Sequence, residues 1–393
     1  MNFTEKKRNL TFSYALVQLF YWVNFAAVTG FTSIYLLHAG FSNTQIGILI
    51  AAAGVISSIL QPILASYADR PSSPSLKKIL ITCSVIMFLL AAALLIFQSS
   101  LILTGFFYTA AITFQHILMP LINSLGMETL NQGKKLNYGA ARGTGSASYA
   151  ITAYILGIIV AMMREITIPV SILLGSLTLL LVLAAFPFQK SRRTTDDRKE
   201  KSSDGLVYFL RKYKRFSVTL FGCIFIYMSH ILINNFAFQI VESKGGGSSE
   251  MGLAIALAAF SELPTLFLFG FMLKKVRVDI WFRLSGVFFL LKSLGSLLAP
   301  NIAVFYCIQV FQMFGWALMT VSSVYYVNSV MEEQDVIKGQ AYMTMMYTLG
   351  SVLGSLIGGA LIDAISVNAM LIFSSASALA GTVIVMVTAS PRN

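Results

Sequence analysis

The chain has 393 residues, of which 56% are hydrophobic and only 11% are charged. A soluble globular protein carries about 25% charged residues, so this composition excludes a water-soluble protein of this length. The 28 lysines and arginines outnumber the 16 acidic residues and give a net charge of +12. Because these basic residues stand in short connections between apolar runs, they indicate loops beside anionic lipid and argue against nucleic-acid binding.

Apolar runs that are long enough to cross a bilayer follow one another along almost the whole chain. A spanning helix needs about 20 mostly apolar residues, and the first run is too long and too aromatic for a cleavable signal peptide. The runs do not alternate with a period of two, which excludes a transmembrane β-barrel. The sequence therefore predicts an all-α membrane protein with twelve transmembrane helices. These are 12–37, 44–67, 78–97, 101–127, 139–162, 167–188, 216–241, 251–273, 279–299, 301–330, 339–361 and 367–389.

The distribution of basic residues predicts how the chain is oriented in the membrane. Lysine and arginine gather in the N-terminal tail and in the even-numbered connections, whereas the odd-numbered connections hold only Arg164 and Lys244. Under the positive-inside rule the even-numbered connections face the cytoplasm. We therefore expect an integral protein of the plasma membrane with both termini in the cytoplasm.

The sixth connection is the only long polar stretch, and it divides the helices into six and six. It predicts an N-terminal six-helix bundle over 1–189, a cytoplasmic linker over 190–215 and a C-terminal six-helix bundle over 216–393. The linker is interpreted as a flexible segment or a surface helix.

Short glycine-containing segments recur at corresponding places in the two halves. Gly40–Gly47 opens helix 2 and Gly247–Gly252 opens helix 8, while Gly139–Arg142 opens helix 5 and Gly339–Tyr342 opens helix 11. Both pairs are separated by about 200 residues, which favours duplicated halves of the kind typical of transporters.

This organisation, with the segment Gln61–Arg70 ahead of a basic turn, resembles the major facilitator superfamily. Ala65-Ser-Tyr-Ala-Asp69-Arg70 is similar to the loop motif between helices 2 and 3 of that superfamily, with Ala65 where glycine is usual. The resemblance covers the whole chain and implies two pseudo-symmetric six-helix bundles that work by alternating access. Asp69 and Arg70 are then expected to form a gating loop. A merely solvated loop would explain the neighbouring lysines but not Asp69.

Within the superfamily, two groups share local features with this chain. Helices 4 and 5 resemble those of the lactose permease and its oligosaccharide relatives. Ser229-His230, Asn234-Asn235-Phe236, a Gly-Ser turn, Met251-Gly252 and Glu262 are more similar to the phenylpropionate-permease and nucleoside-symporter branch.

Four charged residues are placed within the hydrocarbon region: Glu128, Arg142, Glu262 and Lys292. A charge in the hydrocarbon region costs about 2.5–3.5 kcal/mol on insertion scales, and functional pairing is the leading explanation for accepting that cost. Glu262 and Lys292 lie near the bilayer midplane, and we predict that they couple protons to transport, with Glu262 as the first choice. The alternative is a permanent salt bridge that fixes helix packing.

Glu128 and Arg142 flank the short turn between helices 4 and 5 at matching depth, about 10 Å from the membrane face. The short turn predicts that the two helices are antiparallel neighbours and that these side chains can pair. Their positions match the glutamate and arginine with which the lactose permease binds sugar, which implies substrate binding; the alternative is an ion pair that only joins two helices. Tyr149 lies two turns after Arg142 and matches the aromatic residue that stacks on the sugar there, or else it serves packing.

Further candidates are polar residues inside apolar runs. His230 and Asn234 form a polar stripe on helix 7, and Asn24 on helix 1 is a weaker candidate for substrate binding. Helix 10 departs from the lactose permease, because Gln312 and Gly315 stand where that protein has the histidine and carboxylate of its proton coupling. Gln312 is expected either to hydrogen-bond the substrate or to link helices.

These observations predict a secondary active transporter that carries a small organic solute by proton-coupled symport. Arg142 and Lys292 favour an aromatic or other organic acid, whereas the likeness of helices 4 and 5 to sugar carriers favours a glycoside or nucleoside. The alternative is a proton-driven drug or metabolite efflux antiporter of the same fold, although helix 5 lacks the glycine-proline motif of drug–proton antiporters.

Motifs for other functions are missing from the sequence. The chain has no P-loop, no paired-histidine metal motif and no nucleophile motif, so we expect neither an enzyme nor a cofactor or metal. The expected partners are the small-molecule substrate, protons and membrane lipid, and the expected state is a monomer.

Overall fold

Long apolar helices make up the computed structural model, which describes residues 10–68, 70, 72–132, 134–188, 206–332 and 335–390. Twelve of its helical stretches are long and apolar enough to cross a membrane, which confirms the predicted fold class. The elements are α1 (Leu10–Phe25), η1 (Ala26–Gly30), α2 (Thr32–His38), α3 (Asn43–Ala68), α4 (Leu76–Ile96), α5 (Leu101–Asn131), α6 (Tyr138–Met163), α7 (Thr167–Ala185), α8 (Leu206–Lys212), α9 (Lys214–Asn235), α10 (Ala237–Ser243), α11 (Ser248–Lys275), α12 (Val278–Leu298), α13 (Ile302–Gln309), η3 (Val310–Met313), α14 (Trp316–Val330), α15 (Val336–Ala364) and α16 (Val367–Thr388).

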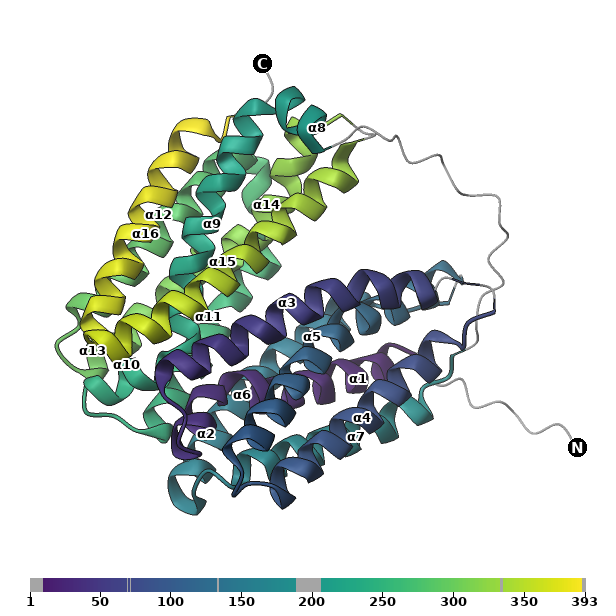
Figure 1. Cartoon of the computed structure of the whole chain (residues 1–393). Coiled ribbons are helices and arrows are strands. Elements are labelled where there is room, and N and C mark those ends of the chain that lie inside the picture. The colour runs from purple at the N-terminus through teal and green to yellow at the C-terminus, as the bar shows by residue number, and fades with distance from the viewer. Residues whose placement is uncertain are drawn as a thin grey trace, which may run out of the picture.

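The helices gather in two groups. Elements α1 to α7 pack together as the N-bundle, and α9 to α16 pack together as the C-bundle (Figure 1). The start of α1, the end of α7, the start of α8 and the end of α16 lie on one side of the molecule, which we call the termini side. The predicted linker falls largely on 189–205, outside the described residues, so the proposed domain boundaries stay a prediction.

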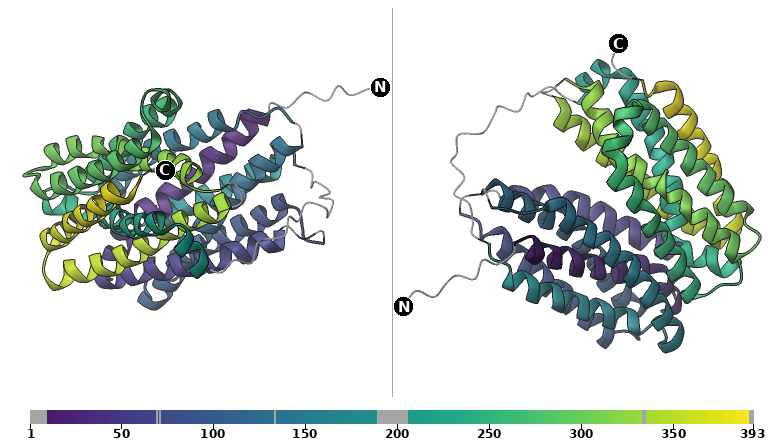
Figure 2. Two further views of the ribbon diagram at one scale, coloured as in Figure 1. Left: turned by 90° about the horizontal axis from the view of Figure 1, so that it is seen from above. Right: turned by 180° about the vertical axis from the view of Figure 1, so that it is seen from behind.

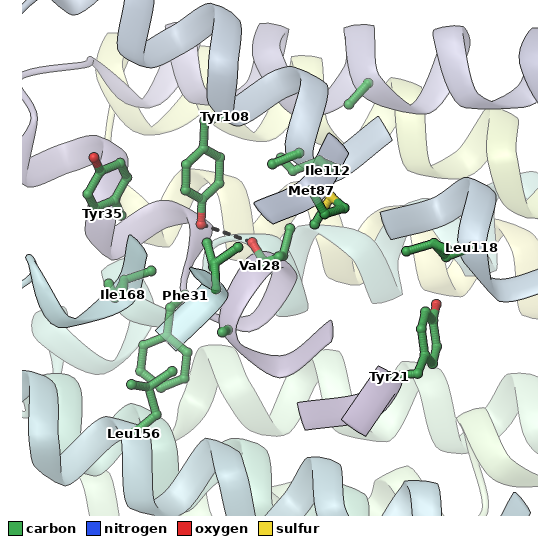
Figure 3. Packing of buried hydrophobic residues seen from close by; sticks show 14 of the residues in the cluster. Tyr21, Val28, Phe31, Tyr35, Met87, Tyr108, Ile112, Leu118, Leu156 and Ile168 are labelled. Carbon is green, nitrogen blue, oxygen red and sulfur yellow. Dashed lines mark hydrogen bonds between the residues drawn. The ribbon is translucent and has the colours of Figure 1, made fainter. Parts of the chain in front are cut away.

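Three of the predicted spans are interrupted where the sequence predicts continuous helix. Helix 1 passes through the π-helical segment η1, helix 7 breaks between α9 and α10, and helix 10 contains the 3₁₀ segment η3. At the first break the carbonyl oxygen of Val28 accepts a hydrogen bond from the Tyr108 hydroxyl at 2.9 Å (Figure 3) and another from Thr32 at 2.8 Å. Side chains can therefore satisfy backbone groups that an unbroken helix would pair internally.

Helix α1 lies between α5 and α6. Its Tyr14 and Tyr21 donate hydrogen bonds to backbone carbonyls of α5, and its other face accepts hydrogen bonds from Thr144 and Ser148 of α6. The sequence predicts that α5 and α6 are antiparallel neighbours, but their main packing partners differ: α6 packs on α1 and α11, and α5 packs on α3 and α4. The two helices meet near the ends that the short turn joins, where the Tyr138 hydroxyl of α6 donates to Asn123 Oδ1 of α5 at 3.1 Å.

The C-bundle is held by small residues and hydroxyl groups. Gly222 of α9 and Gly381 of α16 face each other so closely that no side chain fits between the two backbones. The hydroxyls of Ser229, Ser293 and Ser374 join α9, α12 and α16 through bonds of 2.8–2.9 Å. Close backbone approach and interhelical hydrogen bonds are the usual sources of helix association in lipid.

The two bundles meet on the side opposite the termini and diverge toward the termini side (Figures 1 and 2). Helix α3 packs against α15, and α6 packs against α11. The closest approaches lie near the start of α3 and the end of α15, and where Gly157 of α6 meets Gly252 of α11. This structure is therefore closed on the far side of the membrane from the termini.

A polar cluster on the termini side attaches α8 to the connection before α15. The Lys212 ammonium group bonds Asp335 at 2.7 Å and Glu332 at 2.8 Å, and the Tyr213 hydroxyl donates to Asp335 at 2.8 Å. The hydrogen bonds from Lys212 and Tyr213 hold the pKa of the Asp335 carboxyl below its usual range. These bonds therefore fix the end of α8, where the chain enters the C-bundle.

The Gly222–Gly381 contact generates a stability prediction. In Gly381→Val the new Cβ would lie 2.6 Å from the Gly222 carbonyl oxygen, so α9 and α16 must separate. Overpacking of this kind costs about 1–3 kcal/mol, and we expect a lower thermal unfolding temperature in detergent. The control is Gly270→Val, because nothing lies within 4 Å of a Cβ at that position. Equal melting temperatures for the two variants would contradict the packing described here.

Candidate functional site

A chain of hydrogen bonds links a buried lysine to a carboxylate at the bundle interface. The Lys292 ammonium group of α12 donates to the Gln312 amide oxygen at 2.5 Å, and the Gln312 amide nitrogen donates to Glu262 Oε1 of α11 at 3.0 Å. Lys292 is 2% exposed and Gln312 is 4% exposed, whereas Glu262 is partly exposed. Gln312 therefore stands between the two charged groups, and among the described residues the direct Glu262–Lys292 salt bridge of the alternative interpretation is not formed.

The interruption of helix 10 places Gln312. Gln312 lies in η3, the 3₁₀ segment between α13 and α14, and the Thr265 hydroxyl of α11 donates to the Met313 carbonyl at 2.9 Å. This bond ties η3 to α11 three residues beyond Glu262. Tighter winding in mid-helix shifts the side chains that follow, and such segments often mark functional positions. The interruption of helix 10 therefore places the side-chain amide of Gln312 between α11 and α12.

Arg142 of the N-bundle faces the Lys292–Gln312–Glu262 series of hydrogen bonds from across the interface. Its guanidinium group lies 4.3 Å from the centre of the Trp22 ring, and among the described residues its one hydrogen bond is a long contact of 3.5 Å to Ser146. Arg142 and Glu262 also interact electrostatically, so the two bundles contribute opposite charges to one site. A cation over an indole face is stabilised by the ring quadrupole, and most of the guanidinium donors stay available for a ligand.

Glu128 and Arg142 do not form the expected ion pair within the part of the chain that the structure describes. Glu128 lies near the end of α5 and has another interaction partner, whereas Arg142 reaches toward Trp22 of α1. The physical reason is the position of α1 between α5 and α6. The proposed role of Glu128 in substrate binding stays a prediction.

Aromatic side chains from both bundles surround these charges. In the N-bundle, Tyr149 meets Trp22 edge to face and contacts Phe25, with ring centroids 6.0 Å apart in both cases. In the C-bundle, Trp316 contacts Tyr347 with centroids 5.4 Å apart. The Tyr149 hydroxyl lies close enough to Glu262 and Tyr347 of the opposite bundle for a negative charge on either to disfavour its ionisation. The structure therefore brings Tyr149 into the same site as Arg142, Glu262, Gln312 and Lys292.

His230 lies behind this aromatic layer in the C-bundle. Its ring stacks on Trp316 with centroids 4.5 Å apart, and its Nε2 is 2.8 Å from the Asn234 amide nitrogen. His230 is 4% exposed, and its Nδ1 has no hydrogen-bond partner among the described residues. The His230 ring therefore packs against the back of Trp316. A role of His230 and Asn234 in lining a substrate cavity stays a prediction.

Two other predicted positions lie away from this cluster. Asn24 is fully buried inside the N-bundle, where its amide donates to Gln115 at 3.0 Å and its side chain faces Gly175 of α7. Arg70 is exposed in the turn that follows α3, and Asp69 lies outside the described residues. The gating role of this loop stays a prediction.

Sequence reasoning missed the two tryptophans of the site. The chain has only three tryptophans, and Trp22 and Trp316 stand well inside predicted spans. Tryptophan is enriched at membrane interfaces, so its occurrence away from a helix end is a signal that points to the site.

The model of the MFS_1 like family matches residues 11–373. The chain belongs to the MFS_1 like family. The resemblance of the sequence to the major facilitator superfamily is thereby confirmed. No curated protein sequence matches the chain.

Solved structures share the fold of this MFS_1 like protein at low sequence identity. The nucleoside transporter NupG is 14% identical with a TM-score of 0.80, over 98% of this chain and 100% of that chain. An auto-inhibited POT family peptide transporter is 10% identical with a TM-score of 0.75, over 98% and 97% of the two chains. A bacterial homolog of the human lysosomal transporter Spinster, inward-facing and unoccupied, is 14% identical with a TM-score of 0.65, over 98% and 96%.

The bridging role of Gln312 in this MFS_1 like protein can be tested by thermal unfolding. Gln312→Ala leaves the Lys292 ammonium group buried without its acceptor. An unsatisfied buried donor costs about 1–3 kcal/mol, so we expect a lower unfolding temperature in detergent. Gln309→Ala is the matched control, because Gln309 is equally buried but, within the part of the chain that the structure describes, its side chain makes only a 3.5 Å bond to the Phe305 carbonyl. Equal destabilisation by both changes would contradict the bridge.

Proposed function

We propose that this protein is a secondary active transporter that moves a small organic solute together with protons by alternating access. The observation that carries the proposal is the Lys292–Gln312–Glu262 chain, which ends at the bundle interface opposite Arg142. Charges inside a membrane protein are costly and mark substrate or ion pathways. Placed between two bundles, these groups meet different surroundings when the bundles move.

Glu262 is the proposed proton carrier. Glu262 is the partly exposed end of the Lys292–Gln312–Glu262 series of hydrogen bonds, and it interacts electrostatically with Arg142 and Lys292. Protonation would remove its charge and weaken its attraction to both cations. Arg142 would then be released to bind an acceptor group of the substrate, which links proton binding to substrate binding.

Arg142 is the proposed substrate anchor. Within the described residues, its hydrogen bonding is limited to the long contact with Ser146. A guanidinium group has five N–H donors and suits a carboxylate, while it also donates to hydroxyl and carbonyl oxygens. Trp22 and Tyr149 beside it, and Trp316 and Tyr347 across the interface, favour a substrate with a ring.

The substrate class stays open among an organic acid, a glycoside and a nucleoside. One structural neighbour is a nucleoside transporter and another is a peptide transporter, and at 14% and 10% identity both support the fold only. The efflux antiporter is less well supported, because it predicts a deep acidic group without a partner cation. Here Glu262 is linked through Gln312 to Lys292.

The proposed orientation places the termini side in the cytoplasm of a cell whose plasma membrane holds the protein. The basic residues of the even-numbered connections support this orientation. The bundles meet on the other side, so the arrangement then corresponds to an inward-facing state. Transport requires a second state in which the contacts between α3 and α15 and between α6 and α11 open.

Glu262→Gln tests the coupling step. In proteoliposomes with an imposed proton gradient, a screen of aromatic acids, glycosides and nucleosides identifies the substrate that accumulates. We expect Glu262→Gln to abolish gradient-driven accumulation of that substrate but to retain its exchange across the membrane, because the amide cannot titrate. Glu165→Gln is the control, since Glu165 pairs with His38 at 3.0 Å within the N-bundle, away from the site. Normal accumulation by Glu262→Gln would remove Glu262 from the coupling role.

Arg142→Ala tests the anchor. We expect substrate affinity, measured by the ligand-induced rise in unfolding temperature, to fall by tenfold or more, because loss of charge-assisted hydrogen bonds costs about 1.5–3 kcal/mol. Arg142→Lys keeps the charge but not the planar donor set, and it should bind with intermediate affinity. Arg164→Ala, in the exposed turn between α6 and α7, is the control. Unchanged affinity in Arg142→Ala would limit this side chain to a structural role.

A further inference from the structure

Asp363 joins the two bundles on the side opposite the termini. It lies in the last turn of α15, and its carboxylate accepts hydrogen bonds from the first residues of α3 in the other bundle. Oδ2 accepts from the backbone N–H of Thr44 at 2.7 Å, and Oδ1 accepts from the backbone N–H of Asn43 at 3.2 Å. The side-chain amide of Asn43 also donates to Oδ1, at 2.8 Å.

These are the N–H groups that α3 cannot satisfy by itself. The first turn of any helix leaves its backbone donors without partners inside the helix. In α3 the Ser42 hydroxyl accepts from the N–H of Gln45 at 3.2 Å, and the Gln45 side chain accepts from the N–H of Ser42 at 2.9 Å. This capping box leaves the N–H groups of Asn43 and Thr44, and Asp363 takes both. The cap of α3 is therefore completed by a residue of the other bundle.

A negative charge at this position is also favoured by the helix itself. The N-terminal end of α3 carries a partial positive charge from its aligned peptide dipoles, and a carboxylate close to it is stabilised. Asn43 is held from a second direction, because Gln239 of α10 donates to its side-chain oxygen at 2.7 Å. Two elements of the C-bundle, α15 and α10, are therefore hydrogen-bonded to the Asn43 side chain of the N-bundle.

Backbone contact sets the register of this arrangement. Gly359 lies one turn before Asp363 and faces the Asn43 carbonyl, while Gly47 lies one turn after Asn43 and faces the Ser355 carbonyl. A Cβ at either glycine would overlap the opposing backbone. The two helices therefore touch directly, and this contact brings the carboxylate within reach of the helix end.

The hydrogen bonds that connect the bundles are confined to this end. Between described residues of the N-bundle and the C-bundle there are four, namely the three accepted by Asp363 and the one from Gln239 to Asn43. The three bonds accepted by Asp363 are lost if α3 and α15 separate, and the Asp363 side chain is exposed instead of packed inside its own bundle.

We propose that Asp363 is a latch that caps α3 across the interface and holds the bundles closed on the side opposite the termini. It stabilises only the state in which that side is closed, because the open state leaves the two N–H groups and the carboxylate to water. By population-shift reasoning, its removal must move the equilibrium toward the state that is open there. The meaning of this latch for transport rests on the proposed function, but the equilibrium itself can be measured without substrate.

The test measures the distance between the bundles directly. Spin labels are attached at Ser99→Cys and Asn368→Cys, which are exposed positions on the latch side of the N-bundle and the C-bundle, after replacement of Cys83, Cys223 and Cys307. Pulsed electron paramagnetic resonance then gives the distribution of distances in nanodiscs. In Asp363→Asn, which removes the charge and one acceptor, we expect the ratio of long to short distances to rise about tenfold, as for the loss of charge-assisted hydrogen bonds.

Glu250→Gln is the matched control, because Glu250 caps the N–H of Gly247 at 2.8 Å within its own helix on the same side of the molecule. It should leave the distance distribution unchanged. Asn43→Ala is a second variant that removes two of the four connecting bonds while keeping the carboxylate, and a smaller shift in the same direction is expected. Unshifted distributions in both Asp363→Asn and Asn43→Ala would overturn the latch. Because no substrate or proton gradient is used, that outcome is independent of the test on Glu262.

Discussion

Lys292 places an ammonium group in the hydrocarbon region with 2% of its surface exposed, and keeping this charge hydrogen-bonded explains several features of the C-bundle. Its acceptor is the amide oxygen of Gln312, which lies in a 3₁₀ segment that interrupts helix 10. The same amide donates to Glu262, so a side chain that satisfies the lysine also orients the carboxylate. The buried charge, the helix break and the carboxylate at the interface therefore form one arrangement.

The two bundles contribute different chemistry to the interface between them. The C-bundle supplies the bridged Lys292–Glu262 pair, and the N-bundle supplies Arg142, which lies over Trp22. Farther toward the closed side, the bundles touch through backbone atoms at Gly47 and Gly359 and through the hydrogen bonds of the Asp363 carboxylate. A site in the middle, with separable contacts at one end, is what alternating access requires, because the bundles can tilt without dismantling either one.

The capping of α3 depends on where the other bundle lies, because two of its N-terminal N–H groups are bonded by Asp363 of the C-bundle. A helix end always leaves backbone donors to be satisfied, and α3 satisfies only part of them from its own residues. The remainder depends on Asp363, which belongs to a helix about 320 residues later in the chain. The capping of one helix is in this way tied to the packing of two bundles.

The sequence by itself determined the membrane class, the twelve spans and the positions of the charges within them, because hydropathy is a local property and the bilayer sets the length of each helix. It also singled out Arg142, Glu262, Gln312 and Lys292, since polar residues in apolar runs stand out without any structure, and the resemblance to the lactose permease added Tyr149. Only the tertiary structure decided which of these side chains meet. Arg142 lies on Trp22 instead of pairing with Glu128 because α1 stands between α5 and α6, and Gln312 bridges two charges because helix 10 is broken there. Neighbour order and local winding depend on packing across the whole bundle, which the spacing of residues along one helix does not contain.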